Sequence, residues 1–307
     1  MLTEDNTQCN YIEELLRTHQ MEECNPTATP MEPHTYLLAE DMPATPDLSR
    51  RVRYQEVVGC FQYLAQWTRP ELGFVCSQLA KHLSNPGEVH WTAAVRVLRY
   101  LRGTSSKGIT YTRRAYNGNV MEGFVDADWA SDADSRRSIG GYVFMINGGA
   151  VSWKAKQQNC IAHSSAEGEF MAASKASLEA IWLRRLLKSC GAPQPRATTL
   201  YEDNRACQLM SESPAHRERS KHIDLRVYSL KEQVKNGVVR LFECPTTCMT
   251  ADVFTKSLPG PKFIEHREVL QRATNSSEGT TSGCGTPLLI KNQDPRIVFA
   301  LAVSKSD

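Results

Sequence analysis

Four acidic residues stand where the surrounding sequence predicts apolar side chains or the ends of buried strands. Asp126 lies within Phe124-Val125-Asp126-Ala127-Asp128-Trp129, a run with the alternation of a strand. Glu169 falls on a helical stripe that otherwise holds alanine and leucine, Asp203 ends a strand-like run, and Asp252 opens a short helix. Each alone is also explained by a helix cap, a turn or a surface carboxylate. Together they carry a large desolvation cost unless a cation compensates them.

Magnesium would compensate these carboxylates and would also do chemistry. Mg²⁺ takes oxygen ligands, keeps several waters and needs few carboxylates per ion. Two such ions about 4 Å apart activate a water and stabilise the leaving oxygen of a phosphodiester. The four carboxylates therefore predict a metal-dependent site for phosphodiester hydrolysis.

An α/β layer fold with a mixed sheet is predicted to position this site. Alternation predicts a meander of strands at about 121–129, 139–147 and 149–156, with a hairpin turn at 147–149. A long helix should begin at Ser164, which has capping-box spacing to Glu167, and should end near residue 190. The later elements are expected in this order: strand TTLYEDN (198–204), helices within 220–237, strand VVRLFECP (238–245) and short helix MTADVFTK (249–256).

The first hundred residues predict helices joined by an extended stretch. The helices are expected within 10–21, 53–67 and 87–103, and a proline-rich connection at 25–36 separates the first two. Residues 50–114 hold eleven Lys/Arg and three Glu, a charge of 11 − 3 = +8, whereas the whole chain carries +2. Three arginines line one helix face and either follow a phosphate backbone or are merely solvated: Arg96, Arg99 and Arg102.

Composition places the chain among globular proteins. It has 307 residues, of which 41% are hydrophobic and 23% charged, and it has no apolar run long enough to cross a membrane. The N-terminus lacks the apolar region of a signal peptide. Ten cysteines at scattered spacings predict reduced thiols and an intracellular protein.

The motifs of the chain resemble those of copia-type retrotransposon Pol polyproteins. The stretch from VDADWASDADSRRSIGGYVF to AIWLRRLL, followed by YEDNRAC, SKHID and TADVFTK, resembles the ribonuclease H domain of that family. Upstream, YIEELLRTHQMEECNPTATPM and the segment from YQEVVGCFQYLAQW to VLRYLRGT look like the end of its reverse transcriptase. The resemblance covers roughly residues 10–265, and the motifs occur in family order.

This resemblance implies a ribonuclease H-like fold that cleaves the RNA strand of RNA/DNA hybrids with two Mg²⁺ or Mn²⁺ ions. Its catalytic and metal-binding residues would be Asp126, Glu169, Asp203 and Asp252. Asp128 would be a neighbour of the site, and Asp132 and Asp134 would form a turn. Residues expected to contact nucleic acid are Arg96, Arg99, Arg102, Arg136, Arg137, Lys221 and His222. The expected partners are the RNA/DNA hybrid and other parts of the Pol polyprotein, and no membrane is expected as a partner. The protein would be intracellular, either in cytoplasmic virus-like particles or in the nucleus.

The same resemblance divides the chain into four parts. Residues 1–48 would be a remnant of reverse transcriptase, 49–114 a basic thumb- or connection-like helical segment, and 119–262 the ribonuclease H-like domain. Residues 263–307 would form a poorly ordered tail, rich in Gly, Ser and Thr.

Departures from the family pattern limit the expected activity. The polymerase turn Tyr-x-Asp-Asp is absent because the chain contains no Asp-Asp pair, so no polymerase activity is expected and the palm would lie upstream. Residues 245–251 lack the histidine that cellular ribonucleases H carry before their last aspartate. His222 is either its substitute or a capping or packing residue. Four smaller departures are Val125, Ala166, Gly168 and Met249.

Two other interpretations stay open. His216-x5-His222 with Cys244-x3-Cys248 faintly resembles an integrase zinc module, although its cysteine spacing is one residue too wide. A truncated relic that binds nucleic acid without turnover is the stronger alternative, but the intact set of four carboxylates argues against it.

Overall fold

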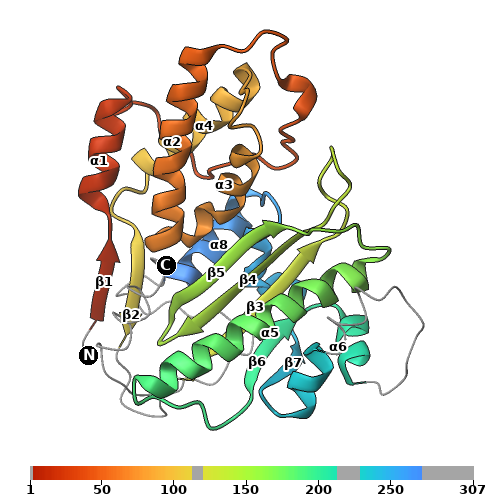
Figure 1. The fold of residues 1–307 in the computed structure, drawn as a ribbon. Coiled ribbons are helices and arrows are strands. Elements are labelled where there is room, and N and C mark those ends of the chain that lie inside the picture. Colours follow the sequence, from red (N-terminus) through yellow and green to blue (C-terminus); the bar gives the residue numbers. More distant parts are fainter. Residues whose placement is uncertain (1–2, 113–119, 213–228, 272–307) are drawn as a thin grey trace.

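The computed structural model describes residues 3–112, 120–212 and 229–271, and it contains the predicted mixed five-stranded sheet (Figure 1). The strands are β3 (Glu122–Asp128), β4 (Ile139–Ile146), β5 (Gly149–Gln157), β6 (Thr198–Glu202) and β7 (Val239–Glu243). Their order is β5-β4-β3-β6-β7; the first three are antiparallel neighbours, and β6 and β7 run parallel to β3. This arrangement is the ribonuclease H-like fold expected from the sequence.

The hairpin between β4 and β5 follows from local chemistry. Asn147 has φ 55° and Gly148 has φ 83°, and a two-residue hairpin turn with positive φ at both central positions suits asparagine followed by glycine. The turn therefore confirms the predicted position of the hairpin.

Helix α5 (Ser165–Ser189) covers one face of the sheet (Figure 1). The Ser164 hydroxyl accepts a hydrogen bond from the Glu167 amide at 3.2 Å, which caps the helix as predicted. Small and branched side chains at helical spacing pack under the helix against the sheet: Ala173, Ala176, Ala180, Leu183 and Leu187. Helix α6 (Arg205–Glu212) follows β6.

The opposite face of the sheet is covered by helices from both ends of the chain. The elements that lie on the sheet are α3 (Gly73–Ala80), α8 (Gly260–Gln271) and the 3-10 turn η4 (Thr250–Phe254). Helices α2 (Leu48–Trp67) and α4 (Glu88–Arg102) pack on α3, with the 3-10 turn η2 (Pro70–Leu72) beside α2. The 3-10 turn η3 (Thr246–Cys248) precedes η4. Val143 and Ala150 of the sheet share one apolar core with these helices. The Trp153 indole also donates a hydrogen bond to the carbonyl of Ala65, at 2.7 Å. The basic helical segment and the sheet are therefore packed as one body.

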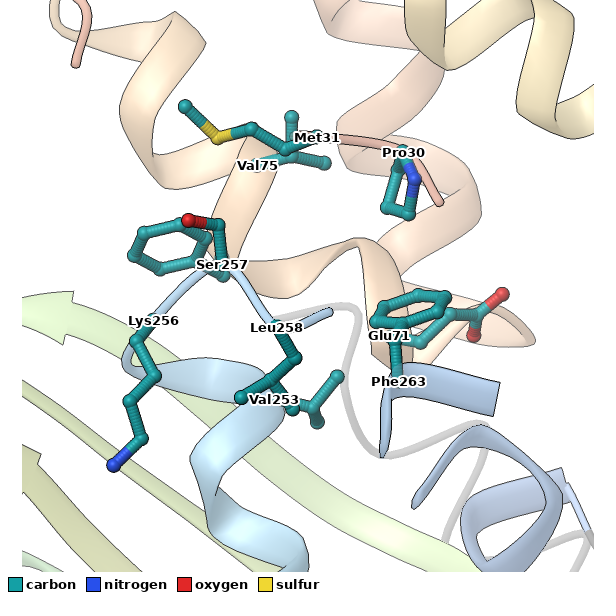
Figure 2. A pocket seen from close by; sticks show the side chains of 10 residues that line it. Pro30, Met31, Glu71, Val75, Val253, Lys256, Ser257, Leu258 and Phe263 are labelled. Carbon is teal, nitrogen blue, oxygen red and sulfur yellow. The ribbon is translucent and has the colours of Figure 1, made fainter. Parts of the chain in front are cut away.

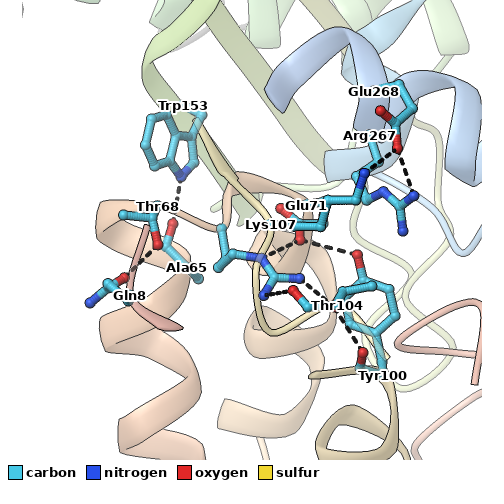
Figure 3. Close-up of polar contacts among 11 residues, drawn as sticks. Gln8, Ala65, Thr68, Glu71, Tyr100, Thr104, Lys107, Trp153, Arg267 and Glu268 are labelled. Carbon is cyan, nitrogen blue, oxygen red and sulfur yellow. Dashed lines mark hydrogen bonds and ion pairs between the residues drawn. The ribbon is translucent and has the colours of Figure 1, made fainter. Parts of the chain in front are cut away.

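A polar cluster, buried around Arg69 and partly exposed at α8, ties the N-terminal helices to α8 (Figure 3). Arg69 and Glu71 are both fully buried and form an ion pair at 2.8 Å. Tyr100 donates its hydroxyl hydrogen bond to Glu71 at 3.1 Å, and Arg69 donates to the Thr104 hydroxyl at 2.7 Å. Lys107, which follows α4, pairs with Glu268 of α8 at 3.3 Å. Buried charges paired in this way specify how these segments meet.

Some predicted boundaries were wrong. The expected tail from residue 263 begins inside α8, where Phe263 and Leu270 are buried, because this helix closes the apolar core. The expected last helix at 249–256 is mostly the 3-10 turn η4. Residues 272–307 lie outside the described part.

Two elements near the N-terminus were not predicted as they stand. The short helix is present as α1 (Cys9–Thr18), but β1 (Thr3–Thr7) and β2 (Gly108–Thr112) add a separate antiparallel pair. Within residues 3–112, 120–212 and 229–271, no helix has the length and apolar character needed to cross a membrane.

Candidate metal and nucleic-acid site

Three of the four predicted carboxylates meet at the carboxyl ends of β3 and β6. One oxygen each of Asp126, Glu169 and Asp203 lies within 4.8 Å of the others. The parallel pairing of Phe124 with Tyr201 sets this geometry, because both strands then end at the same edge of the sheet. Helix α5 crosses β3 there and supplies the glutamate. Three elements of one apolar core thus deliver three oxygen ligands to one point.

Burial and mutual repulsion dominate the electrostatics of this cluster. Asp126 is 2% and Glu169 is 6% exposed. Burial raises the pKa of Glu169 to about 11, and the nearby carboxylates add to the rise. Burial also raises the pKa of Asp126 to about 6, while the Lys256 ammonium opposes the shift. Without a cation, the carboxyl groups of the cluster are therefore difficult to ionise together.

A fifth carboxylate, Glu202, lies close enough to the cluster to raise the pKa of Glu169, and it was missed as a residue near the site. It is fully buried at the end of β6, where burial raises its pKa well above the usual range. Its Oε1 accepts a hydrogen bond from the Asn204 amide at 3.1 Å. Strand alternation was the available signal, because Glu202 lies two residues after the core residue Leu200.

The donor set fits a hard divalent cation. Glu169 Oε2 and Glu202 Oε2 are buried, and neither has a hydrogen-bond partner within residues 3–112, 120–212 and 229–271. Unpaired buried carboxylate oxygens are costly, and a cation compensates them better than a neutral donor does. Oxygen-only ligands of this kind suit Mg²⁺ or Mn²⁺.

Asp252, the fourth predicted carboxylate, is fully buried but is bound to lysines. Its Oδ1 lies 2.8 Å from the Lys256 ammonium, and its Oδ2 lies 2.5 Å from the Lys262 ammonium. It approaches Asp126 closely enough to raise the pKa of that residue. Asp252 is nevertheless outside the group of three whose oxygens converge on one point.

A glycine in β4 allows η4 to bring Asp252 beside Asp126. Gly141 pairs with Asp126 across the two strands, and a Cβ atom placed on it would lie 2.6 Å from the Phe254 Cβ. The missing side chain lets η4 lie directly on the sheet. As a result, the Thr255 hydroxyl donates a hydrogen bond to Asp126 Oδ2.

The charged residues after β3 form the predicted turn and also contact the N-terminal segment. Burial raises the pKa of Asp128, the predicted neighbour of the site. Asp132 forms an ion pair with Lys81, which directly follows α3. Asp134 accepts a hydrogen bond from the Ala39 amide at 3.2 Å. The two predicted nucleic-acid ligands of this turn, Arg136 and Arg137, are exposed.

The three arginines of α4 contact the chain itself. Arg96 pairs with Glu32 at 2.6 Å, Arg99 donates to the Asn25 carbonyl at 2.7 Å, and Arg102 donates to the Glu22 carbonyl. They hold the extended segment 22–32 on the helix. The sequence had suggested only a contact with phosphates or a solvated helix face for these arginines. Contact with phosphates by these side chains stays a prediction.

The remaining predictions at the site concern Lys221, His222 and the zinc alternative. Lys221, His216 and His222 lie outside the described residues. In the part that is described, the carboxylate group is the one cluster with metal-binding geometry, and neither Cys244 nor Cys248 belongs to it. Burial and the charges of Glu202 and Glu169 raise the pKa of the nearby Cys207 thiol, so it is an inert neighbour of the cluster.

Fold and site together define a ribonuclease H-like domain with an acidic centre, packed against an N-terminal helical segment. No protein-family model matches the chain. Over 272 residues, 88% of its length, the chain is 33% identical to the retrovirus-related Pol polyprotein from transposon TNT 1-94 of Nicotiana tabacum, of which the match covers 20%. The chain belongs to the retrovirus-related Pol polyproteins of transposons, and it spans about one fifth of that relative's length.

Two further similarities are shorter or more distant. Over 134 residues, 44% of this chain, it is 46% identical to secreted RxLR effector protein 161 of Plasmopara viticola, covering 93% of that protein. A structure of the foamy viral protease-reverse transcriptase in complex with an RNA/DNA hybrid matches with a TM-score of 0.40 and 13% identity. That match covers 82% of this chain and 30% of the viral chain.

Proposed function

We propose that this chain is the ribonuclease H part of a copia-type Pol polyprotein and hydrolyses the RNA strand of RNA/DNA hybrids. The observation that carries the proposal is the convergence of Asp126, Glu169 and Asp203 within 4.8 Å, at the strand ends of a ribonuclease H-like sheet. Mg²⁺ or Mn²⁺ bound by these residues would supply an activated water and would stabilise charge on the phosphate.

The residues around the cluster orient its carboxylates. The Thr255 hydroxyl donates a hydrogen bond to one oxygen of Asp126 and so holds that carboxylate. Because β3 and α5 are packed on one core, the carboxylates of Asp126 and Glu169 keep their separation when substrate binds. Rigid placement of ligands is what a metal-assisted displacement requires.

Substrate binding would use the positive charge near this edge of the sheet. Arg136 and Arg137 are exposed in the turn that follows the strand of Asp126. Phosphate contacts of arginine position a duplex without reading its sequence, so little sequence preference is expected. Only the RNA strand of a hybrid offers the 2′-hydroxyl that distinguishes the two strands.

The test is an endonuclease assay with purified chain and RNA labelled at its 5′ end. We expect Mg²⁺-dependent cleavage of RNA annealed to DNA, and no cleavage of single-stranded RNA, double-stranded RNA or hybrid with EDTA. Absence of cleavage by folded protein in either Mg²⁺ or Mn²⁺, with hybrid binding retained, would support the binding-only relic instead.

A further inference from the structure

Two buried histidines stack on each other between α3 and α4. His82 lies two residues after α3, and His90 is in the first turn of α4. His82 is 1% exposed and His90 is fully buried. Their ring centroids are 3.9 Å apart, and their planes differ by 20°. The proposed function uses neither residue.

Both rings bind the backbone of residues 36–43, a segment that we call the strap. His82 Nε2 is 3.1 Å from the Leu37 carbonyl oxygen, and His90 Nε2 is 3.2 Å from the Leu38 carbonyl oxygen. A carbonyl oxygen can only accept a hydrogen bond, so both ring nitrogens donate. The two histidines therefore hold two successive peptide groups of the strap.

The remaining contacts of the rings fix both imidazoles in the neutral state. The Gly87 amide donates a hydrogen bond to His90 Nδ1 at 2.9 Å, so that nitrogen carries no proton. His82 Nδ1 is buried and has no hydrogen-bond partner among the residues that the structure describes. A further proton would oppose the Gly87 amide at His90 and would lack an acceptor at His82. It would also bring two positive charges together in one stack.

Charged groups around the two rings partly offset one another. Asp134 faces both rings, Asp41 of the strap faces His90, and Lys81 faces His82. The aspartates favour a protonated ring and Lys81 opposes it, but burial has the largest influence and lowers the pKa of both His82 and His90. The neutral pair is therefore the stable form of the closed strap at neutral pH.

The strap also connects the N-terminal helices to the turn that follows β3. The Ala39 amide donates a hydrogen bond to Asp134 Oδ2 at 3.2 Å. Asp134 lies in the same turn as the exposed Arg136 and Arg137. The position of the strap therefore bears on the turn that carries these two arginines.

The chain that precedes the strap has an anchor without titrating groups. Pro30 and Met31 line a crevice together with Val75 and Val253 (Figure 2). Met31 is 5% exposed and belongs to the apolar core. Because these contacts carry no ionisable group, acid should leave them in place. Residues 24–31 are thus an internal reference for the strap.

We propose that His82 and His90 form an acid-sensitive latch, whose neutral rings hold the strap closed and whose protonation releases it. An open strap exposes the rings to water, where they bind protons more readily than in the closed state. The closed state is therefore fully stable above about pH 6.5 and loses stability as the pH falls below that value. Release would also separate Ala39 from Asp134. The latch does not depend on the metal site or on hybrid cleavage.

A double variant without titrating rings can test the latch. His82→Phe keeps a flat ring in the stack and has no site for a proton. His90→Gln places glutamine at the third helical position, from which its oxygen can accept from the Gly87 amide, as in a capping box. Its amide group can donate to the Leu38 carbonyl. The combined variant should therefore stay closed in acid.

The measurement is amide hydrogen exchange of the whole chain in EDTA at pH 7.5 and 5.5, corrected for the intrinsic effect of pH on exchange. On going to pH 5.5, exchange of the strap should rise about 10-fold more in the wild type than in the double variant. Residues 24–31 should change equally in both proteins. The exposed control His163→Gln should behave as the wild type. An equal rise in wild type and double variant would overturn the inference.

Histidine titration of the wild type by nuclear magnetic resonance is the second measurement, and it decides alone if circular dichroism shows that the double variant is misfolded. The resonances of His82 and His90, assigned with the single variants, should titrate at lower pH than a histidine in a short peptide. The strap should open over the same pH range. Titration at the pH of the peptide, or an acid-induced opening of residues 24–31 together with the strap, would reject the latch.

Discussion

The charge of Glu202 helps to raise the pKa of the Glu169 carboxyl, although Glu169 comes from α5 and Glu202 from the end of β6. Each keeps one buried oxygen, Oε2, that has no hydrogen-bond partner in the described part of the chain. The helix and the strand therefore each bring a buried carboxylate oxygen to the candidate site, and a cation would compensate both.

The first prediction concerns Glu202. Glu202→Gln keeps the shape and the hydrogen bond to the Asn204 amide but removes the charge next to Glu169. Because partners of a metal-binding carboxylate tune its affinity, Mn²⁺ binding should weaken about 10-fold or more. Calorimetry should show this loss, with exposed Glu243→Gln on β7 as the matched control. Equal affinities in Glu202→Gln and wild type would remove Glu202 from the site.

The second prediction concerns pH and stability in the absence of metal. The folded-state pKa of Glu169 is about 11, above that of an exposed carboxyl, so the folded protein holds a proton that the unfolded chain releases. This contribution is fully present below about pH 4 and is lost as pH rises toward the folded pKa. The melting temperature of the EDTA-treated protein should therefore fall between pH 6.5 and 8.

The same linkage predicts the effect of added metal and the control. Mg²⁺ should raise the melting temperature more at pH 8 than at pH 6.5, because it replaces the proton as the compensating charge. Glu169→Gln should flatten the pH dependence of the metal-free protein. If the melting temperature of metal-free Glu169→Gln fell with pH as steeply as that of the wild type, the cluster would not be the cause of the pH dependence.

The third prediction concerns the glycine that admits η4. Gly141→Ala would place a methyl carbon 2.6 Å from the Phe254 Cβ, too close for either backbone to stay in place. Overpacking of this kind costs about 1–3 kcal/mol of folding free energy. It should also displace Thr255 from Asp126 and reduce cleavage. Urea unfolding and the hybrid assay measure the two effects, and Gly59→Ala, where a methyl group meets nothing within 4 Å, is the control.

The fourth prediction separates two groups of arginines. Arg136→Gln with Arg137→Gln should flatten the dependence of hybrid affinity on salt by up to about two units, because both side chains are exposed. The triple change of Arg96, Arg99 and Arg102 should alter that slope less, because their donors already bind segment 22–32. It should instead speed proteolysis of that segment. A slope lowered by about three units in the triple variant would show that α4 lies along the phosphates.

The sheet and the three converging carboxylates could be predicted from the sequence because their signals are local. Alternation around Asp126, the cap at Ser164 and the Asn147-Gly148 turn each act within a few residues. Burial of α8 was not predictable from its own composition, because the partners of Phe263 and Leu270 come from helices far away in the chain. The pairing of Asp252 with Lys262 depends in the same way on where α8 packs.

The role of the α4 arginines shows the same limit. Their regular spacing identified one helix face, but spacing says nothing about what lies on that face. The carbonyls of Glu22 and Asn25 reach them because the proline-rich segment runs along the helix. Glu202, in contrast, carried a usable local signal, because strand alternation places it on the same face as the buried Leu200.

Hybrid cleavage with analysis of the product ends tests the central claim most directly. Wild-type chain and Asp126→Asn, both shown to be folded, would be incubated with end-labelled RNA annealed to DNA in Mg²⁺. We predict internal cuts that leave 5′-phosphate and 3′-hydroxyl ends, as attack by water with a 3′-oxygen leaving group requires. The rate in Asp126→Asn should fall by about 100-fold or more. Cleavage that survives this change, or products with 2′,3′-cyclic phosphate ends, would contradict the account.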